Sequence, residues 1–65
     1  MTYTAKDKAQ EAEREVGYRK FVYSRKVNDG TMKMHDAEQR IAIMQSIADD
    51  YAALAEAEDA AGRLL

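Results

Sequence analysis

The chain has 65 residues, a formal net charge of −2, and neither cysteine nor proline. A chain of this length forms one domain, and the lack of cysteine excludes disulfides and thiolate zinc sites. Because so short a chain buries little apolar surface, association with a second chain is the stabilising device that remains.

The first predicted element is a helix from about residue 4 to residue 28. Thr4 and Asp7 have the spacing of a capping box at its start. The helix is expected to end at Asn28, Asp29 and Gly30, because Asn or Gly readily takes the left-handed conformation that follows a helix. The residues expected to face a second helix recur at alternating steps of four and three. They are Ala5, Ala9, Ala12, Val16, Arg19, Tyr23 and either Lys26 or Val27.

Gly17 interrupts this first helix. In a helix interior, glycine costs about 1 kcal/mol relative to alanine. Two explanations are open. The preferred one is that the second helix crosses closely at Gly17, and the other is that the helix breaks there and leaves residues 1–16 frayed.

The second predicted helix runs from about residue 36 to residue 62, after a turn over residues 29–35. Asp36 is the preferred N-cap, and His35 with Glu38 three residues later gives an alternative start. Folding the chain back near Gly30 pairs positions whose numbers sum to about 64. The residues expected to face the first helix are Ala37, Ile41, Met44, Ala48, Tyr51 and Ala55.

These patterns predict an all-α protein, an antiparallel two-helix hairpin in a single domain. Residues 1–35 carry a formal charge of +3 and residues 36–65 carry −5, so the helices should attract each other. We expect Lys8, Arg14 and Lys26 to lie beside carboxylates of the second helix. Several large apolar residues are left without a partner, and a homodimer forming a four-helix bundle would bury them. This predicted self-association set is Tyr18, Phe21, Val22, Ile43, Ile47 and Leu54.

A second candidate surface combines cations with aromatic side chains on the first helix. Cations contact phosphates while aromatic rings stack on bases, so this composition suits RNA or single-stranded DNA. The alternative is a set of long side chains that flank an apolar interface, which the acidic balance of the chain favours. The cations are Arg14, Arg19, Lys20, Arg25 and Lys26.

No residue set in the sequence predicts catalysis, a cofactor or a metal site. Ser24 and Ser46 have no basic partner nearby, and nucleophilic catalysis needs one. His35, Asp36 and Glu38 occur once, at a helix start, where capping explains them better than a metal does. No apolar run approaches the ~20 residues of a membrane span. We therefore expect a non-enzymatic, soluble, cytoplasmic protein without a membrane partner.

The stretch from Tyr18 to Tyr51 resembles small proteins often encoded in phage and prophage genomes. The shared features are a Val-Tyr pair at 22–23, a Gly-x-Met turn at 30–32, and an Ile-Ala-Ile-Met run at 41–44. Those proteins commonly have proline after the Val-Tyr pair, where this chain has Ser24, so its first helix is expected to run straighter. The resemblance implies a phage setting in a bacterial cytoplasm. The expected partners there are the chain itself and a host or phage protein that it inhibits or modulates.

Overall fold

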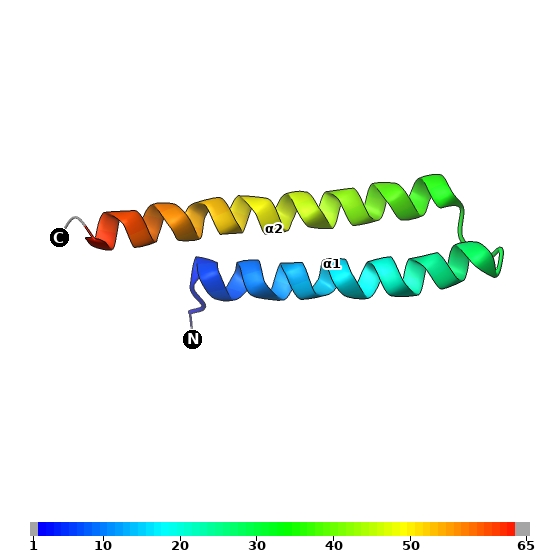
Figure 1. Ribbon diagram of the computed structural model, residues 1–65, viewed down its shortest axis with the longest axis horizontal. Coiled ribbons are helices and arrows are strands. Elements are labelled where there is room, and N and C mark those ends of the chain that lie inside the picture. The colour runs from blue at the N-terminus through cyan, green and yellow to red at the C-terminus, as the bar shows by residue number, and fades with distance from the viewer. Residues whose placement is uncertain (1, 64–65) are drawn as a thin grey trace.

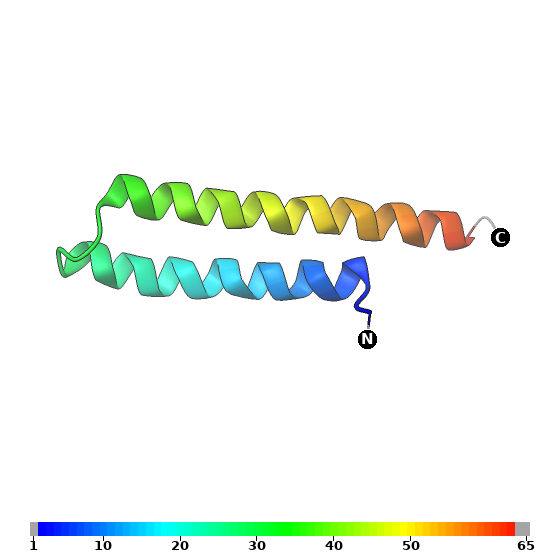
Figure 2. The same cartoon turned by 180° about the vertical axis from the view of Figure 1, so that it is seen from behind.

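The computed structural model describes residues 2–63, with side chains up to residue 62. Helix α1 spans Ala5–Asn28 and helix α2 spans Met34–Arg63. The two helices lie side by side and run in opposite directions, as Figure 1 and Figure 2 show from opposite sides. The described residues contain no strand, so the predicted all-α hairpin is confirmed.

Helix α1 begins with the capping box that the sequence predicts. The backbone N–H of Asp7 donates to Thr4 Oγ1 at 3.0 Å, and the backbone N–H of Thr4 donates to Asp7 Oδ2 at 3.3 Å. Both bonds satisfy donors that have no partner within the helix. The carboxylate also interacts favourably with the positive end of the helix dipole.

Helix α1 ends in a Schellman turn with Gly30 in the left-handed conformation. The φ angle of Gly30 is 78°, a region where a residue with a Cβ atom is strained. The N–H of Gly30 donates to the carbonyl oxygen of Val27 at 3.1 Å, and the N–H of Thr31 donates to that of Lys26 at 2.9 Å. The prediction of a left-handed residue at this helix end is therefore confirmed, and that residue is Gly30.

Helix α2 begins two residues earlier than predicted, at Met34. Its first helical bond runs from the N–H of Ala37 to the carbonyl oxygen of Lys33 at 3.0 Å, which makes Lys33 the N-cap. The predicted N-cap at Asp36 is wrong, and so is the alternative start at His35. Asp36 lies in the first turn instead, where the helix dipole favours a negative charge.

Helix α1 is continuous through Gly17, and neither explanation offered for this residue holds. Gly17 is exposed, and a Cβ atom placed on it would meet no neighbouring atom within 4 Å. The preferred explanation, a close helix crossing, is wrong because α2 does not approach at this position. A break is wrong because the helix continues on both sides.

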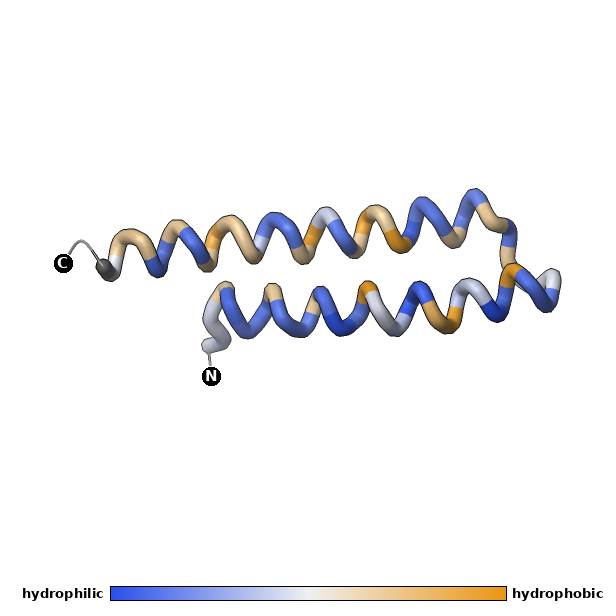
Figure 3. Tube along the Cα trace, in the orientation of Figure 1, coloured by the Kyte–Doolittle hydropathy of each residue, from blue (hydrophilic) through white to orange (hydrophobic). Residues whose placement is uncertain are grey.

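The contact between the helices has small side chains at its centre. Figure 3 shows apolar positions recurring between polar ones along both helices. The larger members of the facing stripes, such as Tyr23, Ile41 and Met44, are half-buried. Both predicted stripes are thus confirmed, although alanine fills most of the contact. Within the described residues, those that are buried are Ala5, Ala9, Ala12, Val16, Ala37 and Ala48.

The register of the two helices differs from the predicted pairing. Two hydrogen bonds and one cation–π contact described between α1 and α2 define the register: Arg19 with Arg40, Glu13 with Gln45, and Lys8 with Tyr51. The numbers in each pair sum to 58 or 59 instead of about 64, so α2 is displaced along α1 by about one and a half turns. The early start of α2 accounts for part of this displacement. Alanine recurs in both stripes, at positions 5, 9 and 12 of α1 and at positions 37, 48 and 55 of α2, so several registers place small side chains in the contact.

Candidate interaction surfaces

Large apolar side chains lie on the surface of the hairpin while small ones fill the contact between its helices. Phe21 is 65% exposed and Tyr18 is 63% exposed. A hydrophobic core normally shows the reverse, because a large apolar side chain gains most from leaving water. In the described part of the chain, the exposed large apolar residues are Tyr3, Tyr18, Phe21, Met34, Ile43, Ile47 and Leu54.

The hairpin also exposes more surface than a compact domain of its mass. Its accessible surface is 5318 Å², whereas a folded monomer of 7.3 kDa exposes about 4200 Å². The radius of gyration is 15.3 Å, compared with about 10.7 Å for a compact chain of this length. A rod of 54 × 22 × 15 Å with apolar side chains on its surface is suited to packing against a partner.

The contacts between the helices show which residues share a side of this rod. The Nζ atom of Lys8 lies 5.4 Å from the ring centroid of Tyr51. Tyr51 and Arg40 are eleven residues apart and therefore share one edge of α2. Gln45 lies on the other edge, where its Nε2 donates to Glu13 Oε1 at 2.9 Å.

On the side of Tyr51 and Arg40, helix α2 presents three exposed apolar side chains. Ile43, Ile47 and Leu54 follow the same edge at helical spacing, with exposed fractions between 39% and 52%. We call these three residues the α2 ridge. They are the exposed large apolar side chains that this edge of α2 carries, and Met34 is exposed at the start of the helix.

Helix α1 borders the α2 ridge mainly with charged side chains. Lys8, Glu11 and Glu15 recur there at steps of three and four. Val22, which is half-buried, lies on the same edge nearer the turn. The predicted self-association set is therefore divided: Val22 lies on the edge next to the α2 ridge, Phe21 lies on the outer face of α1, and Tyr18, seven residues after Glu11, lies between them.

The outer face of α1, opposite its buried stripe, carries alternating basic and aromatic residues. Arg14, Tyr18, Phe21 and Arg25 are spaced by four, three and four residues, and all four are exposed. The guanidinium carbon of Arg25 lies 5.7 Å from the ring centroid of Phe21, within the range of a cation–π contact. We call these four residues the α1 strip.

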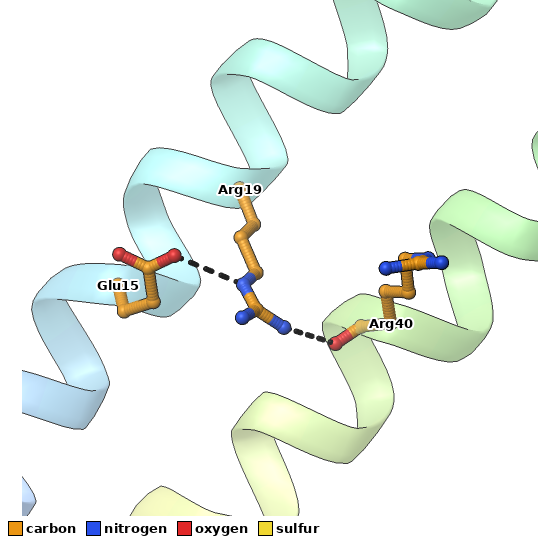
Figure 4. Close-up of polar contacts among 3 residues, drawn as sticks. All are labelled: Glu15, Arg19 and Arg40. Carbon is orange, nitrogen blue, oxygen red and sulfur yellow. Dashed lines mark hydrogen bonds and ion pairs between the residues drawn. The ribbon is translucent and has the colours of Figure 1, made fainter. Parts of the chain in front are cut away.

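Arg19 does not belong to this exposed basic surface, contrary to its place in the predicted set of cations. Its Nε donates to Glu15 Oε1 at 3.0 Å, and its Nη1 donates to the backbone carbonyl oxygen of Arg40 at 3.1 Å (Figure 4). The side chain is 26% exposed. Arg19 therefore joins α1 to α2, and its hydrogen bonds are directed at the protein itself.

The cations expected beside carboxylates of α2 make other contacts. Lys8 lies over the ring of Tyr51 instead of beside a carboxylate. Arg14 pairs with Glu11 of its own helix at 4.0 Å, with both side chains exposed. Such a pair contributes little to stability. The two ion pairs described between residues 2 and 62 both lie within α1.

The remaining predicted cations do not complete a basic face. Lys20 and Lys26 are exposed, and their side chains make no described hydrogen bond or ion pair, including with Asp36 and Glu38. They lie on opposite flanks of α1. Of the five predicted cations, only Arg14 and Arg25 share the α1 strip.

The described residues hold no group of three or more His, Asp or Glu that would bind a metal ion. Ser24 Oγ donates to the carbonyl oxygen of Lys20 at 2.6 Å, a bond within its own helix. No described helix has the length and hydropathy to span a bilayer.

Three features of these surfaces were missed from the sequence. Arg19 had a usable signal, because it stands in the stripe that faces α2 and four residues after Glu15. Gln45 had none, since it lies beside the facing stripe and its partner Glu13 depends on the register. Tyr3 precedes the first helical turn, outside the periodic pattern.

Comparison of the chain with protein-family models, with curated proteins and with solved structures found no match. The phage resemblance therefore stays a prediction, and the functional argument depends on the two surfaces, the α2 ridge and the α1 strip.

Proposed function

We propose that the protein is a non-enzymatic binding module that self-associates and acts by contacting another protein. The observation that carries this proposal is the inverted distribution of apolar side chains, with alanine between the helices and large residues outside. A second copy packed on the α2 ridge would form a four-helix bundle. Burying the exposed part of each ridge side chain contributes about 1 kcal/mol, so six of them in a dimer contribute several.

The α1 strip is the surface that we assign to the protein partner. It lies on the face of α1 opposite α2, so a dimer formed through the α2 ridge leaves it accessible. Tyr and Arg are enriched among the residues that dominate the energetics of protein interfaces. In the phage setting that the resemblance implies, the partner is a host or phage protein whose activity the contact inhibits or modulates.

Sedimentation of two matched variants tests the assignment of the two surfaces. Ile47→Asp places a charge in the α2 ridge and is expected to give a monomer with a lower Tm. Phe21→Asp places the same charge in the α1 strip and is expected to stay dimeric. A wild-type chain that sediments as a stable monomer at high concentration would contradict the proposal.

A second candidate function is binding of single-stranded nucleic acid through the α1 strip. The observation that favours it is that two exposed arginines, Arg14 and Arg25, lie on one face of α1 with the exposed rings of Tyr18 and Phe21 between them. Cations on phosphates and stacked aromatic rings are the usual elements of such binding.

A gel-shift titration at about 50 mM salt separates this candidate from the first, because phosphate contacts are strongest at low salt. Arg14→Glu combined with Arg25→Glu should then abolish the shift, with Lys6→Glu as a control outside the strip. Absence of any shift with the wild-type protein rejects nucleic-acid binding.

A further inference from the structure

Formal charge is distributed unevenly along the length of the folded hairpin. This distribution is not apparent from the order of the residues in the sequence. The turn half, residues 16–43, carries six Lys/Arg against three Asp/Glu, a formal charge of +3. The open half, residues 1–15 and 44–65, carries four Lys/Arg against nine Asp/Glu, a formal charge of −5. The register brings these segments together, because facing positions sum to 58 or 59.

Helix α2 also extends beyond the start of α1. With the same register, Ala5 faces residue 53 or 54, so the last turns of α2 continue past α1 at the open end, as Figure 1 shows. This overhang includes Glu56, Glu58 and Asp59. An acidic segment therefore projects from one end of the rod while the cations gather near the other end.

Two of the three residues of the α2 ridge are symmetric about the midpoint of their helix. The midpoint of Met34–Arg63 falls between residues 48 and 49. Ile43 and Leu54 lie equally far from it on either side, and Ile47 lies next to it. A two-fold axis through this midpoint and across the rod sets Ile43 of one copy against Leu54 of the other.

We propose that two copies pair through the α2 ridge with their turns at opposite ends. This inference rests on the proposed self-association and adds its orientation. The arrangement places ridge on ridge and sets the +3 half of each copy against the −5 half of the other. The acidic overhang of one copy then lies near the cationic segment 16–28 of its partner.

The opposite orientation, with both turns at one end, is disfavoured on two grounds. It stacks the two +3 halves on each other and the two −5 halves on each other. It also lays the α2 ridge of one copy over the charged border of the other, which consists of Lys8, Glu11 and Glu15. Apolar side chains would then cover charged ones and remove them from water.

Spin labels at single introduced cysteines measure the orientation in the full chain. Asn28→Cys places a label at the turn end, where it is exposed. We expect a distance between the two labels close to the 54 Å length of the hairpin. Ser46→Cys, near the midpoint of α2, is the matched control and should give a short distance whenever a dimer forms.

The outcomes separate this inference from the proposed self-association. A dimer whose Asn28→Cys labels lie within about 25 Å, two helix diameters, overturns the orientation and leaves self-association intact. A chain without dipolar coupling at Ser46→Cys that sediments as a monomer overturns both. The long distance at residue 28 with the short one at residue 46 supports the proposal.

Charge reversal at two exposed lysines gives an independent test, because the two orientations predict opposite changes in the dimer dissociation constant. Lys20→Glu makes the turn half less positive, so the dimer dissociation constant at low salt should rise roughly threefold to tenfold. Lys6→Glu, the same change at the open end, should leave the constant unchanged or lower it. The reverse pattern, tighter association with Lys20→Glu and weaker with Lys6→Glu, would indicate turns at the same end.

Discussion

Arg19 resembles its neighbouring cations in composition but differs from them in its contacts. Its guanidinium group joins Glu15 of the preceding turn to the backbone of α2 at Arg40. The partner within α1 was predictable, because the two residues are four apart and Arg19 stands in the facing stripe. The acceptor on α2 was not predictable, because it depends on the register of the two helices and the alanine stripes do not determine that register.

Replacing Arg19 with lysine should lower the free energy of unfolding by about 1 kcal/mol. Lysine keeps the charge but lacks the planar fork that reaches both acceptors at once. Thermal unfolding should show a Tm lower by about 4–8 °C. Arg14→Lys is the control, because Arg14 makes only an exposed pair with Glu11, and its Tm should stay within about 2 °C of wild type. Equal Tm values for the two variants would contradict the bridging role.

Gly17 offers a stabilising substitution. Gly17→Ala should raise the free energy of unfolding by about 0.5–1 kcal/mol, because the site is helical and open and alanine restricts the unfolded chain. Gly30→Ala should lower it, because the φ angle of 78° strains a residue with a Cβ atom. Urea titrations of both variants check the pair. A loss of stability with Gly17→Ala would indicate a close contact at that residue.

The ends of the two helices differ in how far the sequence determines them. Helix α1 begins and ends at local motifs of a few residues, the capping box at Thr4 and the left-handed turn at Gly30, and both were predictable. Helix α2 begins after Lys33, a residue type without N-cap preference. Propensity pointed to Asp36 as the N-cap, but the N-cap is Lys33, three residues earlier.

Removing the capping box should weaken the start of α1 specifically. Thr4→Ala deletes the acceptor for the Asp7 N–H and should lower the free energy of unfolding by about 1 kcal/mol. Amide hydrogen exchange should accelerate most in the first turn of α1. Thr2→Ala, at an exposed residue before the helix, is the control and should change neither quantity. Uniform acceleration along both helices would mean that the cap acts on the whole hairpin.

For the whole molecule, apolar periodicity was enough to predict a hairpin and its facing stripes. It was not enough to predict the register, because the buried stripes are mostly alanine and repeat with little variation. The surfaces followed from the same pattern only in part. Exposure of Tyr18, Phe21, Ile43, Ile47 and Leu54 was expected, whereas their division between two faces required the contacts between the helices.

The stability of the wild-type hairpin should depend on its concentration if self-association covers the α2 ridge. Mass action stabilises the associated form, so the Tm should rise by several degrees over a hundredfold increase in chain concentration. Ile47→Asp should remove this dependence, while Phe21→Asp should keep it. Calorimetry across the concentration series measures all three. A Tm independent of concentration in the wild type would contradict self-association.

The alanine contact between α1 and α2 has a mechanical consequence. Large interlocking side chains resist sliding, whereas a smooth row of methyl groups offers little resistance to movement along the helix axis. The relative position of the helices along this axis is then fixed by the short turn at Gly30 and by the hydrogen bonds of Arg19 and Gln45. Lengthening that turn should therefore allow α2 to shift its register along α1, with little change in helical content.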